Sequence, residues 1–258
     1  MRLMNMKCKE VEDYFAKNQT VIVATGSIEN HGSHNPLGVD TLVPDQILAI
    51  VEQKSNIMIA PTIPYGACDS LVGFAGTISI GGKVLYRMID KIIKCLHSYG
   101  CRRIIFLNGH GGNKAAIDKA SLKWHKKGVK SACMDWWLML LDFNPEWRAG
   151  HGGFVETSAT MAINPHLVDL SLVREMELLN PYGDHMPSAY VKTVRYKGVS
   201  TTISGSIKEF TSNGWFGKDH PKESSAEKGR QMIQAVAEYI VVFAEEFDKK
   251  LPPYQAKN

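Results

Sequence analysis

The chain has 258 residues and a formal net charge of +4 at pH 7. Hydrophobic residues make up 44% of the chain and charged residues 22%, which is typical of a soluble globular protein with a sizeable core. The small net charge and the lack of a Lys/Arg tract argue against a nucleic-acid partner. No apolar stretch approaches the roughly 18 residues of a membrane span. Because α/β folds of this length often form one unit, we expect residues 1–258 to be a single domain.

The cysteines and the N-terminus both predict a cytoplasmic protein. An odd, scattered set of cysteines without CxxC spacing is typical of reduced thiols rather than of a disulfide framework. Residues 1–18 mix charged and apolar side chains and lack the apolar core of a signal peptide. The five cysteines are Cys8, Cys68, Cys95, Cys101 and Cys133.

Apolar runs that read as strands alternate with amphipathic stretches that read as helices. This alternation predicts βαβ units, and therefore a three-layer α/β/α fold with a mostly parallel central sheet and helices on both faces. Residues 164–221 are less periodic and predict an irregular extension that is β-rich over 189–199 and 201–207. The expected elements are helix 6–17, strand 20–25, helix 41–53, strand 56–60, helix 82–99, strand 103–107, helix 113–127, strand 131–134, helix 156–163 and helix 223–250.

Three polar loops carry side chains of metal-ligand type. The loop 26–40 follows the first strand, and the loop 108–113 follows the third. Because the carboxyl ends of parallel strands meet at one edge of a sheet, we expect these two loops to converge there. A glycine-rich loop at 64–77 is expected at the same edge, and the region 147–158 supplies a third set. The candidate ligands are Glu29, His31, Asp40, His110 and Glu156, with His34 and His151 nearby.

Two histidines with three carboxylates suit Zn²⁺, Mn²⁺ or Fe²⁺. Five such ligands exceed what one tetrahedral zinc with an open position needs, but they are enough for two divalent ions if one carboxylate bridges them. We therefore expect two divalent metal ions, with zinc as the favoured metal. This centre would activate a hydroxide for attack on a carbonyl, and His151, outside the ligand count, would transfer a proton as the catalytic residue.

Other interpretations of the same residues stay open. His110 could be a hydrogen-bonded loop residue, and Glu156 an ordinary first-turn helix carboxylate. Residues 109–112 could form an anion nest of a phosphate- or dinucleotide-binding module, although the GxGxxG spacing and the P-loop lysine are missing. A metal-binding scaffold without turnover is the other rival class. Cys68 lacks a dedicated base and is expected to be a packing residue rather than a nucleophile.

Taken in order, three motifs resemble those of the creatininase (creatinine amidohydrolase) family. The resemblance runs from about residue 20 to residue 163 and is weaker in the C-terminal part. The motifs are Gly26-Ser27-Ile28-Glu29-Asn30-His31-Gly32 with Pro36-Leu37-Gly38 and Asp40, then Asn108-Gly109-His110-Gly111-Gly112-Asn113, then His151 with Glu156-Thr157-Ser158.

The resemblance implies an α/β/α single domain, a dinuclear metal centre and often a homohexamer. By position, it implies that Glu29 and His110 hold one ion, that His31 and Glu156 hold the other, and that Asp40 bridges them. It places His151 at the proton-transferring histidine of the family. It also implies substrate contacts for Trp147, at an aromatic position of the pocket, and for Gly111 and Gly112 of the second motif.

The chain departs from strict creatininases at two places. They have a glutamate shortly after the histidine of the second motif, where this chain has Gly112. Many members have Ser and His where this chain has Cys68 and Leu71, so the segment 68–74 has no assigned substrate contacts. These departures point to the broader branch of the family, which includes deformylases, a peptidase of peptide-cofactor maturation and an inositol-derived ketone hydrolase.

The sequence therefore predicts a metal-dependent hydrolase that cleaves the C–N bond of a small polar molecule, a cyclic amide or a formamide. A hydrolase of a cyclic ketone C–C bond in inositol or sugar breakdown and a non-catalytic metal scaffold are the alternatives. The expected partners are a small-molecule substrate and other copies of the chain, with no nucleic acid and no membrane.

Overall fold

The computed structural model describes residues 1–249, the side chain of Asp248 excepted. Its centre is a sheet of four parallel strands in the order β2-β1-β3-β4. Every residue of β1 and β3 is buried, because helices cover both faces of the sheet. The strands are β1 (Thr20–Thr25), β2 (Met58–Ile59), β3 (Arg103–Asn108) and β4 (Lys130–Asp135).

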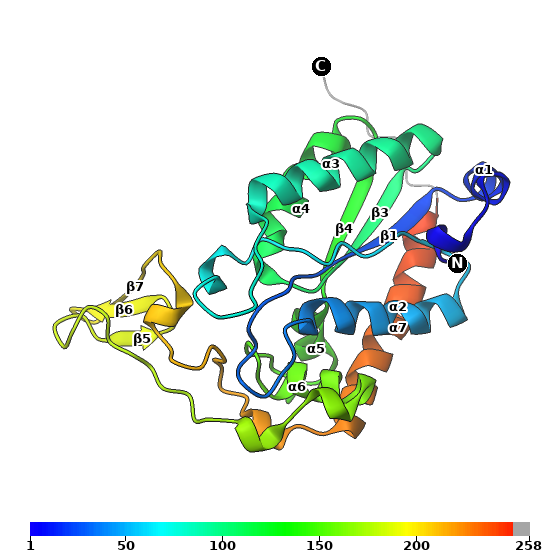
Figure 1. Cartoon of the computed structure of the whole chain (residues 1–258). Coiled ribbons are helices and arrows are strands. Elements are labelled where there is room, and N and C mark those ends of the chain that lie inside the picture. Colours follow the sequence, from blue (N-terminus) through cyan, green and yellow to red (C-terminus); the bar gives the residue numbers. More distant parts are fainter. Residues whose placement is uncertain (250–258) are drawn as a thin grey trace.

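Alternate residues of each strand enter two separate apolar cores. Ile22 and Ile105 pack against helices α2, α5, α6 and α7, whereas Val21 and Ile104 pack on the opposite face against α1, α3 and α4. Figure 1 shows these two helical layers on either side of the sheet, and they confirm the predicted α/β/α fold class. The helices are α1 (Cys8–Lys17), α2 (Val39–Lys54), α3 (Gly81–Tyr99), α4 (Lys114–His125), α5 (Trp136–Phe143), α6 (Phe154–Ile163) and α7 (Ala226–Asp248).

Several predicted boundaries differ from the observed ones. Helix α5 was not predicted, because its eight residues follow β4 directly and are apolar on nearly every side. Helix α2 begins at Val39 rather than at residue 41, so Asp40 lies in the helix and not in the preceding loop. Helix α7 begins three residues later than expected, and the last residue predicted for it, Lys250, lies outside the described residues.

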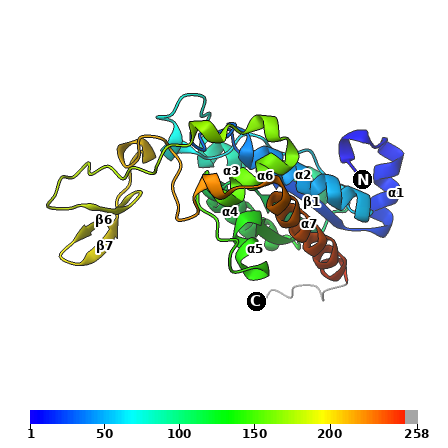
Figure 2. The ribbon, with the colours of Figure 1, turned by 90° about the horizontal axis from the view of Figure 1, so that it is seen from below.

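Residues 164–221 form the expected irregular, partly β extension. Its strands β5 (Ser188–Tyr190), β6 (Thr193–Tyr196) and β7 (Val199–Thr202) make a small antiparallel sheet that projects from the main body (Figures 1 and 2). A third apolar cluster joins this sheet to the loop after β2, with Val194 and Phe210 on one side and Leu71 and Phe74 on the other. Short 3₁₀ turns lie at Leu3–Asn5, Asp69–Leu71, Gly111–Asn113, Pro165–Leu167, Leu170–Leu172, Ile207–Glu209 and Pro221–Glu223.

Strands β1, β3 and β4 end at the same level of the sheet. Their register aligns Thr25 with Asn108, and Asn108 with Asp135. The three side chains are joined, because Thr25 Oγ1 donates to Asn108 Oδ1 at 2.9 Å and Asn108 Nδ2 donates to Asp135 Oδ1 at 2.7 Å. The loops that follow these strands therefore begin side by side, as the parallel sheet predicts.

Among the described residues, no helix combines the length and the apolar character that crossing a membrane requires. All five cysteines are free thiols. The expectation of a single domain stays a prediction.

Candidate metal centre

Close backbone packing brings the loop after β3 onto the first turn of α2. A Cβ atom at Gly109 would lie 1.9 Å from the carbonyl oxygen of Asp40, so only glycine fits this contact. The buried amide of Asn113 then joins two further loops. It donates to the carbonyl of Gly26 at 2.9 Å and accepts from the backbone N–H of Ala67 at 2.9 Å. Three loops predicted to converge therefore do so through specific contacts.

The five predicted ligands come from two loops and from the first turns of two helices. Glu29 and His31 follow β1, and His110 follows β3. Asp40 and Glu156 lie in the first turns of α2 and α6, where the helix dipole stabilises a carboxylate. Four of the five are buried, and His110 is half-buried. Carboxylates buried this deeply require a positive partner.

These side chains form two groups that share Asp40. In the first group, His110 Nδ1 lies 3.0 Å from Glu29 Oε2 and 3.1 Å from Asp40 Oδ2. In the second, His31 Nε2 lies 3.0 Å from Asp40 Oδ1 and 3.6 Å from Glu156 Oε2. The two oxygens of Asp40 thus face different groups, and within each group the ligand atoms lie within 4.8 Å of one another. The arrangement fits two cations with Asp40 between them.

Outer contacts set which ring nitrogen of each histidine faces its group. His31 Nδ1 lies 3.1 Å from the carbonyl oxygen of Glu29, and His110 Nε2 lies 3.2 Å from that of Ala67. A carbonyl can only accept, so each of these nitrogens carries a proton, and the other nitrogen, which faces Asp40, is the one that a metal ion would bind. Metal-binding histidines are typically oriented in this way. Ser27, whose hydroxyl lies 2.7 Å from Glu29 Oε2 and 2.9 Å from Asp40 Oδ2, adds a donor behind the carboxylates.

Without a metal ion, the cluster holds extra protons to balance its carboxylates. Burial and the neighbouring Asp40 raise the pKa of Glu29, and burial together with Asp40 raises the pKa of Glu156 to about 8. Burial opposes the charge of His31, but Asp40 and Glu156 outweigh it and raise the pKa of His31 to about 10. Among the described residues, the buried Glu29 Oε1 also has no hydrogen-bond partner. A buried carboxylate oxygen without a hydrogen-bond partner is available to bind a metal ion.

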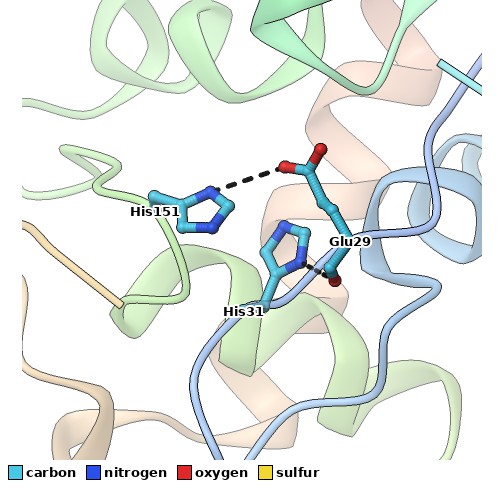
Figure 3. A group of neighbouring side chains, drawn as sticks. All are labelled: Glu29, His31 and His151. Carbon is cyan, nitrogen blue, oxygen red and sulfur yellow. Dashed lines mark hydrogen bonds and ion pairs between the residues drawn. The ribbon is translucent and has the colours of Figure 1, made fainter. Parts of the chain in front are cut away.

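His151 lies beside the cluster and faces it with one nitrogen (Figure 3). Its Nε2 lies 2.7 Å from the carbonyl oxygen of Asn30 and therefore donates, whereas its Nδ1 lies 3.8 Å from Glu29 Oε1. The ring is packed between His31, at 4.3 Å between centroids, and Phe216, at 4.8 Å. Burial and the neighbouring His31 lower the pKa of His151 to about 3, so its Nδ1 is unprotonated at neutral pH. It also lies within ligand distance of Glu29 and His31.

Residues far along the chain hold His151 in place, and the sequence analysis named His34 among them but missed Phe216. The backbone groups of His151 and Phe216 pair in both directions, at 2.8 and 2.9 Å. The imidazole of His34 lies 2.9 Å from the carbonyl oxygen of Gly152, and the Gly152 N–H donates to Glu156 Oε2 at 2.6 Å. The contacts of Phe216 and His34 join segments 65 or more residues apart, and no local pattern in the sequence signals them.

A cavity of about 310 Å³ opens over the cluster and includes Glu29, Asp40, His110, His151 and Glu156 in its lining. Of the predicted substrate contacts, Gly111 lines this cavity, whereas Trp147 and Gly112 do not. Trp147 instead lines a neighbouring pocket with Phe154 and Asp219, and packs against the core under α7. The indole that reaches the cavity belongs to Trp137, a residue of the helix that sequence analysis missed.

Comparison with known proteins gives the family. The model of the family described as creatinine amidohydrolase matches residues 4–244. The chain belongs to the creatininase family. It is 30% identical to creatinine amidohydrolase from Pseudomonas putida over 205 residues, which cover 70% of this chain and 75% of that protein. It is 32% identical to the mycofactocin precursor peptide peptidase of Mycolicibacterium smegmatis over 151 residues, which cover 56% of this chain and 58% of the peptidase.

The fold agrees with this membership. A crystal structure of creatinine amidohydrolase superposes with a TM-score of 0.75 at 23% identity, covering 97% of this chain and 98% of that one. The predicted family is therefore confirmed, and the chain is a hydrolase of the creatininase family.

Gly112 and Cys68, two of the positions where the sequence departs from strict creatininases, are both closely packed. A Cβ atom at Gly112 would lie 2.2 Å from the Ala67 carbonyl oxygen and 2.5 Å from His110 Nε2, so the glutamate expected of a strict creatininase has no room there. Cys68 is buried, and burial together with Glu29 raises the pKa of its thiol to about 12. A thiol with that pKa is a poor nucleophile, which agrees with the predicted packing role.

Proposed function

We propose that this chain is a dinuclear metal-dependent hydrolase that cleaves the C–N bond of a small amide. The observation that carries the proposal is the pair of ligand groups sharing Asp40 beneath one cavity. Two divalent ions bound there would lower the pKa of a water molecule and polarise the substrate carbonyl. Zinc suits the mixed histidine and carboxylate set best, with manganese and iron as alternatives.

Different residues of the chain would bind the ions and transfer the proton. Glu29 and His110 would hold one ion, His31 and Glu156 the other, and Asp40 both. His151 would accept the proton of the attacking water at Nδ1, because its Nε2 proton is committed to the Asn30 carbonyl. Passing that proton to the departing nitrogen would complete the hydrolysis, in which water adds to the carbonyl carbon and the C–N bond breaks.

The stacking of His151 between His31 and Phe216 supports its role as a positioned proton carrier. Its lowered pKa leaves the ring neutral, with Nδ1 unprotonated, at neutral pH. A metal scaffold without turnover would not need an oriented, unprotonated imidazole at the edge of its cavity. The non-catalytic scaffold is therefore one outcome of the test below, and not the function proposed here.

The test compares metal-free and zinc-reconstituted protein on formamides, cyclic amides, dipeptides and cyclic ketones. We expect turnover of an amide that depends on zinc and is lost in His151→Gln, while that variant keeps its metal. His166→Gln, which changes an exposed histidine, is the matched control and should keep full activity. Turnover of cyclic ketones alone would favour C–C cleavage, and no turnover in the metal-loaded protein would favour the scaffold.

We also propose that the chain forms a homo-oligomer in the cytoplasm. The family resemblance suggests a hexamer. Exposed apolar side chains on α5 and α7 are a surface that subunit contact would cover, and the five free thiols suit a reducing compartment. Light scattering of the purified protein gives the subunit number directly. The exposed side chains are Leu138, Leu141, Phe143, Tyr239 and Val242.

A further inference from the structure

The wall of the cavity away from the ligand cluster is made largely of apolar side chains. Leu71 and Ile207 are buried at 2% and 6% exposure and belong to the apolar cluster beneath the small antiparallel sheet. Beside them, Ala149 and Gly150 add no polar side chain to the lining. The side chains of this wall are Ser70, Leu71, Trp137, Tyr190, Ile207 and Phe216.

This wall has few groups that can recognise a hydroxylated substrate. The Ser70 and Tyr190 hydroxyls and the Trp137 indole N–H are its polar side-chain groups. A site that binds a polyol must pair each hydroxyl, because a buried hydroxyl without a partner costs binding free energy. An apolar wall with so few donors and acceptors favours a substrate that is apolar on that side.

The wall begins at the proposed proton carrier. Phe216 stacks on His151 with an interplanar angle of 24°, and Tyr190 meets Phe216 edge-on at 6.0 Å between centroids. A substrate whose carbonyl lies over the ligand cluster therefore has its neighbouring group against these rings. Aromatic and branched aliphatic groups gain most from contact of this kind.

We infer that the substrate is an amide with an aromatic or branched aliphatic group beside the scissile bond, and that Tyr190 is a specificity-determining residue for that group. The inference rests on the proposed hydrolysis of a C–N bond. It departs from the small polar molecule that the sequence predicts, because the residues of the wall come from segments whose place in the site the sequence did not reveal. Tyr190 is 41% exposed, so its ring can be removed without opening the core.

The test separates the metal-binding end of a ligand from its substituent. Three hydroxamates share one metal-binding group: acetohydroxamate, phenylacetohydroxamate and gluconohydroxamate. Their dissociation constants are measured by calorimetry on the zinc-reconstituted full chain. We expect phenylacetohydroxamate to bind roughly tenfold tighter than acetohydroxamate, since its ring leaves water for the apolar wall, and gluconohydroxamate to bind no tighter than acetohydroxamate.

Variants connect the preference to Tyr190. In Tyr190→Ala the advantage of the phenyl group should fall several-fold while acetohydroxamate binds as before. Tyr196→Ala removes a comparably exposed tyrosine of the same small sheet outside the cavity lining, and it should keep the wild-type ratio. A polyhydroxylated ligand that binds tightest, or a ratio unchanged in Tyr190→Ala, would overturn the inference. Failure of all three hydroxamates to bind zinc-loaded protein would overturn the proposed function and this inference together.

Discussion

Substituting Gly112 with alanine should weaken one metal position without touching a ligand. The added Cβ atom would lie 2.2 Å from the carbonyl oxygen of Ala67 and 2.5 Å from Nε2 of His110. These two atoms are hydrogen-bond partners at 3.2 Å, and their bond orients the His110 ring. The N–H of Ala67 is held in turn by Asn113 Oδ1 at 2.9 Å, so this residue cannot move away freely. The methyl group therefore separates His110 from the carbonyl that positions it.

The size of the effect follows from the geometry. Ordinary van der Waals contact for a Cβ atom begins at 3.4 Å, so the Ala67 oxygen must move by 1.2 Å, the difference from 2.2 Å. A displacement of that size breaks the Nε2 hydrogen bond and turns the ring. Loss of an outer contact to a ligating histidine typically lowers metal affinity by about 10- to 100-fold. We expect this loss for the ion between Glu29 and His110, and little change for the ion between His31 and Glu156.

The assay is competitive titration of zinc against a chromophoric chelator, which resolves a strong and a weakened position. Gly111→Ala is the matched control, because a Cβ atom there would lie 3.8 Å from the Trp137 ring, an ordinary contact. Thermal unfolding of the metal-free proteins checks that both variants fold. Wild-type affinity at both positions of a folded Gly112→Ala protein would refute the assignment of His110 as a ligand held by Ala67.

Three further predictions address other parts of the site. Glu156→Gln should lower the metal content from about two equivalents to about one in elemental analysis, and retention of two would remove Glu156 from the ligand set. His34→Ala should destabilise the protein by roughly 1–3 kcal/mol in urea unfolding. The buried Gly152 carbonyl would lose its 2.9 Å donor and keep only the longer contact from Thr157 Oγ1 at 3.4 Å. An unchanged midpoint would show that another group replaces His34. Zinc binding at pH 7 should release protons, because a zinc ligand must be deprotonated and His31 is protonated in the metal-free protein. Burial lowers the pKa of His31, but Asp40 and Glu156 outweigh this effect and raise it to about 10. Calorimetry in buffers of different ionisation enthalpy measures the proton release. Zinc affinity should therefore fall as pH is lowered, and binding without proton release would contradict this protonation state.

The parallel sheet and the convergence of the ligand loops could be predicted from the sequence because both follow from local patterns. Apolar runs such as 103–107 define strands, and their parallel arrangement brings the loops after them to one edge. The side chains of Glu29 and His110 therefore lie together as predicted, although 81 residues separate them in the chain.

The wall of the cavity could not be predicted, because it depends on contacts without a local signal. Phe216 reaches His151 through backbone pairing between irregular segments, and Tyr190 comes from a three-residue strand. Such segments lack a hydrophobic periodicity and are too short for the sequence to indicate what they pack against. The same limit affected the tryptophans: Trp147 matches a motif position but lines a separate pocket, whereas Trp137 reaches the cavity from an unpredicted helix.

The metal content of wild-type protein and of Asp40→Ala tests the shared-carboxylate centre most directly. Asp45→Ala, which changes another carboxylate of α2 outside the ligand groups, serves as the control. After zinc reconstitution and gel filtration, we predict about two equivalents in wild type and in the control and almost none in Asp40→Ala, since both ions depend on Asp40. One equivalent in wild type, or two in a folded Asp40→Ala protein, would contradict a dinuclear centre bridged by Asp40.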